Sequence, residues 1–270
     1  MPFTLIKGTL NPTFGRPDGD SLRFVPDNPD PIFRLRRRGF KPKMNEDNGS
    51  IQLRYEGIDT MESAADDTFS LTATESNLQL ANSDNPGSPS RGYIYSNQIG
   101  PNGRPIAFVF SGDTDGEDGT GFFLSADDIM QSINVQQMQR GHAYPLFYDT
   151  LFDDLRLRMR DVSLKAKSDG EGLWPSDKTN DTVTWSGSLD TLPPIFPKLW
   201  RRIQEFRRDE TLFDPDRPFA NFAEWVEIEK PERVAIPTQD RFTGFDDLIE
   251  ATEDTVKLTI DPHDMVIVSV

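Results

Sequence analysis

Short segments of alternating hydrophobic and polar residues occupy the first 110 positions of the chain. A period of two is typical of β-strands that bury one face. We expect strands at residues 3–10, 21–25, 51–58, 92–99 and 106–110. The Gly-Pro-Asn-Gly sequence that separates the last two segments predicts a β-hairpin.

Apolar residues recur at helical spacing further along the chain. Residues 70–81 predict a weak helix, and residues 125–141 predict a second one with Ser125 as its N-cap. The apolar stripe in residues 151–166 predicts a third, amphipathic helix. Strands followed by helices indicate an α+β fold, in which helices pack on one side of a small β-barrel. We expect this domain to end near residue 178.

The remaining segment, residues 179–270, has a different pattern, with helices followed by strands. We expect helices around residues 196–206 and 219–226, and strands at 233–236, 255–260 and 265–270. We therefore divide the chain into a first domain, residues 1–178, and a C-terminal extension. A small α+β accessory domain packed on the barrel is the favoured interpretation of the extension, and a partner-binding module is the alternative.

Two polar segments each allow two interpretations. Residues 26–50 form an irregular insertion that contains the basic cluster 34–38, either a solvated strand face or an edge that contacts phosphate. The acidic segment 113–119 is either a solvated hairpin tip or a calcium loop, although it lacks the spacing and terminal glutamate of an EF-hand.

Composition limits the chemistry that the chain can support. It has 270 residues, a net charge of −16, no cysteine and two histidines. These counts exclude disulfides, thiolate metal sites, cysteine nucleophiles and a three-histidine zinc site within one chain. Oxygen ligation remains, and it suits calcium or magnesium. The acidic balance gives no long-range attraction to a polyanion, which argues against nucleic acid as substrate.

The location of the protein is also constrained by its hydropathy. No apolar run approaches the roughly 18 residues that a membrane span requires. The first residues lack a basic region followed by an apolar one, the pattern of a signal peptide. We expect a cytoplasmic protein that does not associate with membranes, and a monomer is favoured.

Three separated motifs carry oxygen ligands and arginines. They are Asp18-Gly19-Asp20 in a turn, Arg54 to Glu62 along a strand and past its end, and Gly103-Arg104 at a strand start. Singly, each motif is a common structural feature, because Asp-Gly forms turns and a strand arginine usually faces solvent. Their occurrence together favours a site for a cation and a charged substrate.

The chemistry of this set is that of phosphodiester hydrolysis, which requires neutralised charge and an activated water. Asp20 and Asp59, if brought together, would hold a divalent cation, with the backbone carbonyl of Thr60 as a third ligand. Glu62 would orient or deprotonate water. The planar guanidinium groups of Arg54 and Arg104 would bind phosphoryl oxygens.

With these motifs in this order, the chain resembles the staphylococcal nuclease (thermonuclease) family over roughly residues 1–178. Asp18-Gly19-Asp20-Ser21 is similar to the family's Asp-Gly-Asp-Thr turn. The family's Arg-x-x-x-x-Asp-Thr-Pro-Glu strand is matched at the same spacing by Arg54, Asp59, Thr60 and Glu62, with Met61 in place of proline. Its later Gly-Arg and its helical finish are matched by Gly103-Arg104, Gly141, Ala143-Tyr144 and residues 151–174.

The resemblance implies a five-stranded OB-fold barrel with three helices and a calcium-dependent endonuclease that cleaves DNA and RNA to 3′-phosphate ends. By position, Asp20, Asp59 and the Thr60 carbonyl would bind Ca²⁺, and Asp18 would lie behind these ligands. Arg54, Glu62 and Arg104 would be catalytic. Tyr144 and Tyr148 are both candidates for the tyrosine of the nucleotide pocket.

The chain also departs from the family pattern. Pro105 follows Arg104, and the family's lysine and tyrosine just before Gly-Arg are absent. The acidic charge predicts weak binding to long duplexes, so we expect a preference for single strands. An inactive, nuclease-like module that binds nucleic acid or protein is the alternative function.

Overall fold

A computed structural model describes residues 2–37, 39–65, 67–185, 189, 192–209 and 221–269. Three residues used in the sequence predictions, Arg38, Phe219 and Val270, lie outside the described residues. None of the helices in the described ranges is both long enough and apolar enough to cross a membrane.

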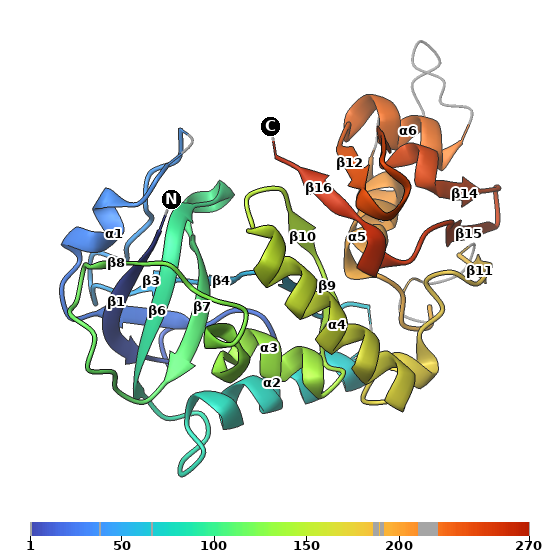
Figure 1. Ribbon diagram of the computed structural model, residues 1–270. Coiled ribbons are helices and arrows are strands. Elements are labelled where there is room, and N and C mark those ends of the chain that lie inside the picture. The colour runs from blue at the N-terminus through green and yellow to red at the C-terminus, as the bar shows by residue number, and fades with distance from the viewer. Residues whose placement is uncertain are drawn as a thin grey trace.

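The first part of the chain forms a nearly closed β-barrel sheet (Figure 1). Its main path runs in the order β3-β2-β1-β6-β7-β4, and every pair is antiparallel except the parallel pair β4–β7. β3 and β4 lie at opposite ends of this order but are consecutive in the chain, so the sheet curls back on itself. The strands are β1 (Phe3–Leu10), β2 (Arg23–Pro26), β3 (Ile51–Gln52), β4 (Arg54–Tyr55), β6 (Ser90–Ile99), β7 (Pro105–Ser111) and β8 (Gly121–Phe122), which pairs with β1.

The predicted strand at residues 51–58 is interrupted. Past β4 the chain turns at Gly57, which has φ 75°, and β5 (Ile58–Asp59) then leaves the barrel to pair with β9 (Tyr144–Pro145). A Cβ at position 57 would also lie 2.7 Å from the end of the Met159 side chain, which would have to shift, so the positive φ is the main reason for glycine there. Residues 55–59 are buried on both sides, which is why the predicted alternation stops.

Helices pack against the barrel and share its core. α2 (Asp67–Ala81) and α4 (Asp153–Asp169) lie close to their predicted positions. The single helix predicted for residues 125–141 is instead a 3-10 turn, η2 (Asp128–Gln131), followed by α3 (Ile133–Gln139). Ser132 causes the break, because its side chain accepts a hydrogen bond from the Val135 amide and caps the new helix.

The insertion at residues 26–50 contains one short helix, α1 (Asp30–Arg34), where only irregular structure was predicted. The basic cluster begins in this helix, so its first arginine does not belong to a strand face. The acidic segment 113–119 is bonded back onto β1, because the Lys7 amide donates to Asp118 at 2.8 Å. Asp118 therefore has a structural role, because it holds the loop against the barrel.

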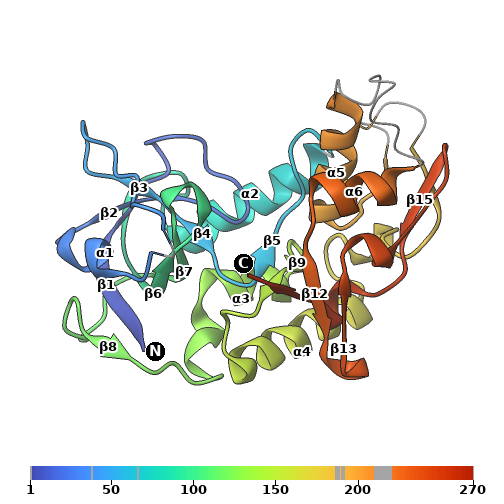
Figure 2. The ribbon, with the colours of Figure 1, turned by 90° about the horizontal axis from the view of Figure 1, so that it is seen from above.

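The extension contains helices and strands, as predicted, and it continues the first part rather than standing apart from it. A parallel pairing joins β10 (Phe147–Tyr148) to β16 (Val266–Val268), near the end of the chain. One apolar core contains Met61 and Tyr144 from the first part together with Trp200 from the extension. Both views show the barrel on one side, the extension on the other, and the C-terminal end between them (Figures 1 and 2).

The remaining elements complete the extension and its connections. The helices are α5 (Pro197–Arg208) and α6 (Phe222–Glu229). The strands are β11 (Val183–Thr184), β12 (Arg233–Ile236), β13 (Arg241–Gly244), β14 (Ile249–Ala251) and β15 (Thr255–Leu258). Short 3-10 turns are η1 (Pro101–Gly103), η3 (Trp174–Ser176), η6 (Pro237–Gln239), η7 (Asp246–Leu248) and η8 (Pro262–Asp264).

Candidate functional site

Arg54 joins two carboxylates that are far apart in sequence. The Tyr55 amide donates to the Asp20 carbonyl at 3.1 Å, which places the turn at residues 18–21 directly beside β4. The Arg54 guanidinium then contacts the Asp20 carboxylate and donates to Oδ1 of Asp59 at 2.8 Å. The side chains of Asp20 and Asp59 are both buried, so the structure brings together the two predicted metal ligands and the predicted catalytic arginine.

The turn that carries Asp20 has little freedom to move. Oδ1 of Asp18 accepts a hydrogen bond from the Asp20 amide at 3.2 Å. A Cβ on Gly19 would lie 2.7 Å from the side chain of Thr60 and 2.6 Å from Ala73 on α2, so glycine allows the close approach. The third predicted ligand, Thr60, is thereby held against the turn.

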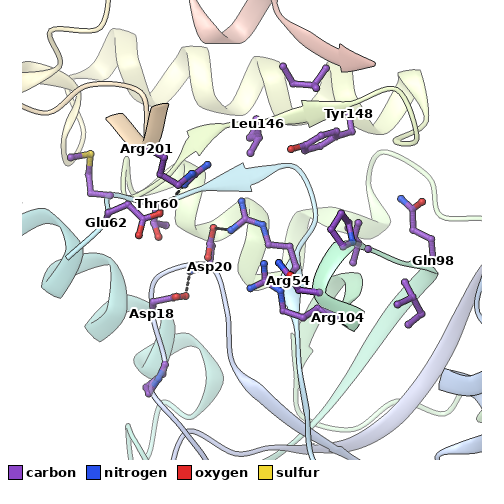
Figure 3. A pocket seen from close by; sticks show the side chains of 18 of the residues that line it. Asp18, Asp20, Arg54, Thr60, Glu62, Gln98, Arg104, Leu146, Tyr148 and Arg201 are labelled. Atoms are coloured by element: carbon purple, nitrogen blue, oxygen red, sulfur yellow. Dashed lines mark hydrogen bonds and ion pairs between the residues drawn. The ribbon is translucent and has the colours of Figure 1, made fainter. Parts of the chain in front are cut away.

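Arg201 enters this site from α5, in the extension (Figure 3). Its two terminal nitrogens donate to both oxygens of Asp59, Nη1 to Oδ1 at 3.1 Å and Nη2 to Oδ2 at 2.7 Å. Nη1 also donates to Oε1 of Glu62 at 2.8 Å. The sequence alone does not single out this residue as part of the site, because a polar helix face carrying several basic residues does not show which one reaches a distant carboxylate.

Arg104 lies beside Arg54 and faces the same space (Figure 3). It follows Gly103, whose φ of 74° turns the chain into β7. Among the described residues it forms no ion pair, and its Nε is buried without a hydrogen-bond partner. Burial lowers the pKa of Arg104, and the neighbouring charge of Arg54 lowers it further. An unpaired, half-buried guanidinium of this kind is suited to bind an anion.

The two central carboxylates have opposite pKa shifts. Burial raises the pKa of Asp20 well above its usual value despite Arg54, and the charges of Asp18 and Asp59 add to the rise. Burial also acts to raise the pKa of Asp59, but Arg201 and Arg54 outweigh it, so the net pKa is lowered. Further positive charge near Asp20 would therefore stabilise its ionised carboxylate.

The donor chemistry fits a hard divalent cation, because two adjacent carboxylates and a backbone carbonyl at Thr60 are all oxygen ligands. Both oxygens of Asp59 are already bonded to Arg201, which would have to release at least one of them. No group of three or more His, Cys, Asp or Glu side chains suited to a metal ion occurs in the part of the chain that the structure describes.

Asp20, Arg54, Thr60, Glu62, Arg104 and Arg201 line a cavity of about 1170 Å³ between the barrel and the extension. Asp59, which is 1% exposed, is not one of the lining residues. Tyr148 lies on its wall, as the prediction for a nucleotide pocket requires (Figure 3). The other candidate, Tyr144, is fully buried, and its hydroxyl donates to Asp177 at 2.9 Å, so it is not available to a substrate. Charged groups on the wall are Arg16, Asp18, Asp20, Arg54, Glu62, Arg104, Arg201 and Glu232.

A second set of reactive side chains lies outside the cavity. Nε2 of His263 and Oγ of Ser163 are 2.9 Å apart, and Nδ1 of His263 contacts Asp261. These residue types form the triad of many hydrolases. Here Ser163 and His263 are at most 1% exposed and do not line the cavity, so the set is structural and fastens η8 to α4.

Neither a scan against protein-family models nor a search of the curated proteins found a match to this chain.

Proposed function

We propose that the protein is a calcium-dependent endonuclease, with an OB-fold barrel like that of staphylococcal nuclease, that hydrolyses single-stranded DNA or RNA. The observation that carries the proposal is the guanidinium of Arg104, which forms no ion pair with any described residue and lines the same cavity as Asp20 and Arg54. Asp59 is bonded to that Arg54. A phosphodiester anion would supply a partner for Arg104, which has none among the described residues, and oxygen ligands for a cation lie nearby.

The metal would be held by the carboxylates of Asp20 and Asp59 and by the carbonyl of Thr60. When bound, a divalent cation there supplies positive charge that offsets the negative charge of the phosphodiester. Arg104 binds a phosphoryl oxygen through its guanidinium, whose Nε has no hydrogen-bond partner among the described residues. Arg54, anchored by both aspartates, is held rigidly beside it, so its charge is positioned before the substrate arrives.

Glu62 is the residue suited to accept the proton of the attacking water. Its side chain is 41% exposed, so water reaches it, and it lies beside Asp59 because Arg201 contacts both. Attack of the water oxygen at phosphorus forms one P–O bond and breaks the bond to the 5′ oxygen, which takes a proton from solvent, so the products are a 3′-phosphate and a 5′-hydroxyl. The general-base role requires Glu62 to be released from Arg201, which now donates to it.

Shape and charge both favour a short, single-stranded substrate. The cavity, at about 1170 Å³, slightly exceeds the ~300–1,000 Å³ range of small-molecule pockets. One wall belongs to the extension, through residues 267–269, so the site is a cleft and not an open barrel surface. The net charge of −16 offers no steering for a long duplex.

One observation favours the alternative of an inactive binding module. Arg201 bonds Asp59 and Glu62 at once, which removes a metal ligand and the proposed base from use in this conformation. If that contact is permanent, the cavity retains Arg104 for binding an anion and loses turnover.

The deciding experiment is cleavage of a fluorescently labelled DNA 20-mer, which at ~20 nucleotides is longer than the ~4–16 nucleotides that one OB-fold covers and so fills the site. The full chain is assayed with Ca²⁺, with EDTA, and as the variants Glu62→Ala and Glu46→Ala, the latter an exposed control in the insertion. We expect cleavage that requires Ca²⁺ and is lost only in Glu62→Ala. Retained binding without cleavage in any of these conditions would favour the inactive module.

A further inference from the structure

The contact between Arg201 and the barrel site differs from an ordinary surface ion pair. Both oxygens of Asp59 are bonded, Asp59 is 1% exposed, and the same guanidinium reaches Glu62. We infer that Arg201 is a tethered cation that competes with the divalent metal for Asp59, so the extension sets the metal affinity of the site. This inference rests on the proposed function, because it concerns the same metal ligands.

The backbone that carries Arg201 is firmly anchored. Trp200 and Ile203, on either side of it in α5, are buried in the apolar core that also contains Met61 and Tyr144. Lys198 and Arg202 both bond Glu232, at 2.6 and 2.9 Å, which fixes the helix to the segment before β12. The start of the arginine side chain is therefore held in place, and this gives its guanidinium a high effective concentration at Asp59.

The cavity offers space into which the Arg201 guanidinium can rotate. The Arg201 side chain is 30% exposed and lies on the cavity wall. Rotation of the side chain would move its charge into the cavity without unfolding α5. Arg104, which has no carboxylate partner in the part of the chain that the structure describes, and the released Arg201 would then both face a bound anion.

Competition follows from the number of oxygen atoms. Asp59 has two carboxylate oxygens, and Arg201 uses both, while Arg54 shares Oδ1. A cation that binds this carboxylate must displace at least one of these hydrogen bonds, so the free energy of the Arg201 contact is subtracted from that of metal binding. Coupling of this kind is reciprocal, so metal binding should in turn loosen Arg201.

A purely structural ion pair leads to the opposite expectation. In that case removal of Arg201 leaves the ligands less well ordered, and metal affinity is unchanged or lower. The sign of the change in affinity therefore separates the two roles, independently of any effect on folding stability.

The test is calorimetric titration of the full chain with CaCl₂, comparing wild type with Arg201→Met, Arg201→Lys and Arg208→Met. Arg208 is the matched control, because it is exposed on the last turn of the same helix. We expect Arg201→Met to bind Ca²⁺ about tenfold more tightly than wild type, about 1.4 kcal/mol. Arg201→Lys, which keeps the charge but not the fork, should be intermediate, and Arg208→Met should match wild type.

Several results would overturn the inference. One is Ca²⁺ binding by folded Arg201→Met that is no tighter than that of wild type. Another is the absence of Ca²⁺ binding in both wild type and Arg201→Met. If Arg201→Met does not fold, Arg201→Lys decides alone, and affinity no higher than that of wild type counts against competition. As a second readout, Ca²⁺ should raise the melting temperature of Arg201→Met more than that of wild type.

The fate of the proposed function is read separately, from cleavage. Tighter Ca²⁺ binding in Arg201→Met without cleavage by either protein supports the competition and rejects the nuclease. Cleavage with unchanged Ca²⁺ affinity supports the nuclease and rejects the competition.

Discussion

Arg201 and Asp59 are 142 positions apart, yet two hydrogen bonds join the guanidinium of one to both carboxylate oxygens of the other. The contact crosses from the extension to the barrel and reaches the site that the barrel motifs define. The extension therefore takes part in the electrostatics of the site, and it also supplies one wall of the cavity. Whatever the site binds, it binds between the two parts of the chain.

Replacement of the two arginines of the sequence motifs, Arg54 and Arg104, should have different effects on stability and activity. Arg104→Gln removes a guanidinium that forms no ion pair within the described ranges, so we expect stability close to that of wild type and a loss in kcat of about 10²–10³-fold. Arg54→Gln leaves two buried carboxylates with less compensation, and we expect a loss of about 3 kcal/mol in unfolding free energy as well. Urea unfolding and single-strand cleavage measure both quantities. Equal destabilisation by the two variants would contradict the pairing described above.

The two tyrosines of the predicted nucleotide pocket provide a matched pair. Tyr148→Phe changes a hydroxyl near the cavity wall, so we expect a higher KM for oligonucleotide and little change in melting temperature. Tyr144→Phe removes the hydrogen bond to Asp177 in the core, and we expect a cost of about 1–2 kcal/mol in stability with KM unchanged. If Tyr144→Phe raised KM and Tyr148→Phe did not, the assignment from burial would be wrong.

Glu56 should make stability depend on pH near neutrality. Burial raises its pKa to about 7, against 4.5 for the ordinary group, so the folded state binds the proton more tightly than the unfolded state. The resulting contribution to stability is complete below pH 4.5 and is lost as pH rises to about 7, by about 3 kcal/mol in all. Glu56→Gln should remove this slope in urea unfolding between pH 4.5 and 7.5. The exposed Glu46→Gln should keep it, and an unchanged slope in Glu56→Gln would count against the raised pKa.

The buried Ser163–His263–Asp261 set should matter for stability and not for chemistry. Ser163→Ala removes the 2.9 Å contact to His263, and we expect a loss of about 1–2 kcal/mol in unfolding free energy with cleavage unchanged. A fluorophosphonate probe, which labels activated serines, should leave the native protein unmodified. Labelling at Ser163, or loss of turnover in a folded Ser163→Ala protein, would identify a second active site.

Much of the barrel could be predicted because the signals were local. Alternation of apolar residues marked β1, β6 and β7, and helical spacing marked α2, α4 and α5. The motifs also identified Asp20, Arg54 and Asp59, which the structure brings into contact. Turn and strand sequences restrict the backbone over a few residues, but the contact between Asp20 and Arg54 also needs the turn at residues 18–21 to lie beside β4.

Other features depended on what surrounds a residue. The break after β4 follows from burial on both sides of residues 55–59 and from the close approach of Met159 to Gly57. The burial of Tyr144 follows from a core shared with the extension, so spacing could not separate it from Tyr148.

The sequence by itself determined which residue types are present near the turn and strand ends, and hence the oxygen and guanidinium chemistry that the site can support. Only the tertiary structure decided which basic side chain of the extension pairs with Asp59. Arg201 was one basic residue among several on a polar helix face, and its partner depends on how α5 packs beside the barrel. Electrostatic contacts act through space, so a pairing over 142 positions leaves no periodic pattern in the sequence.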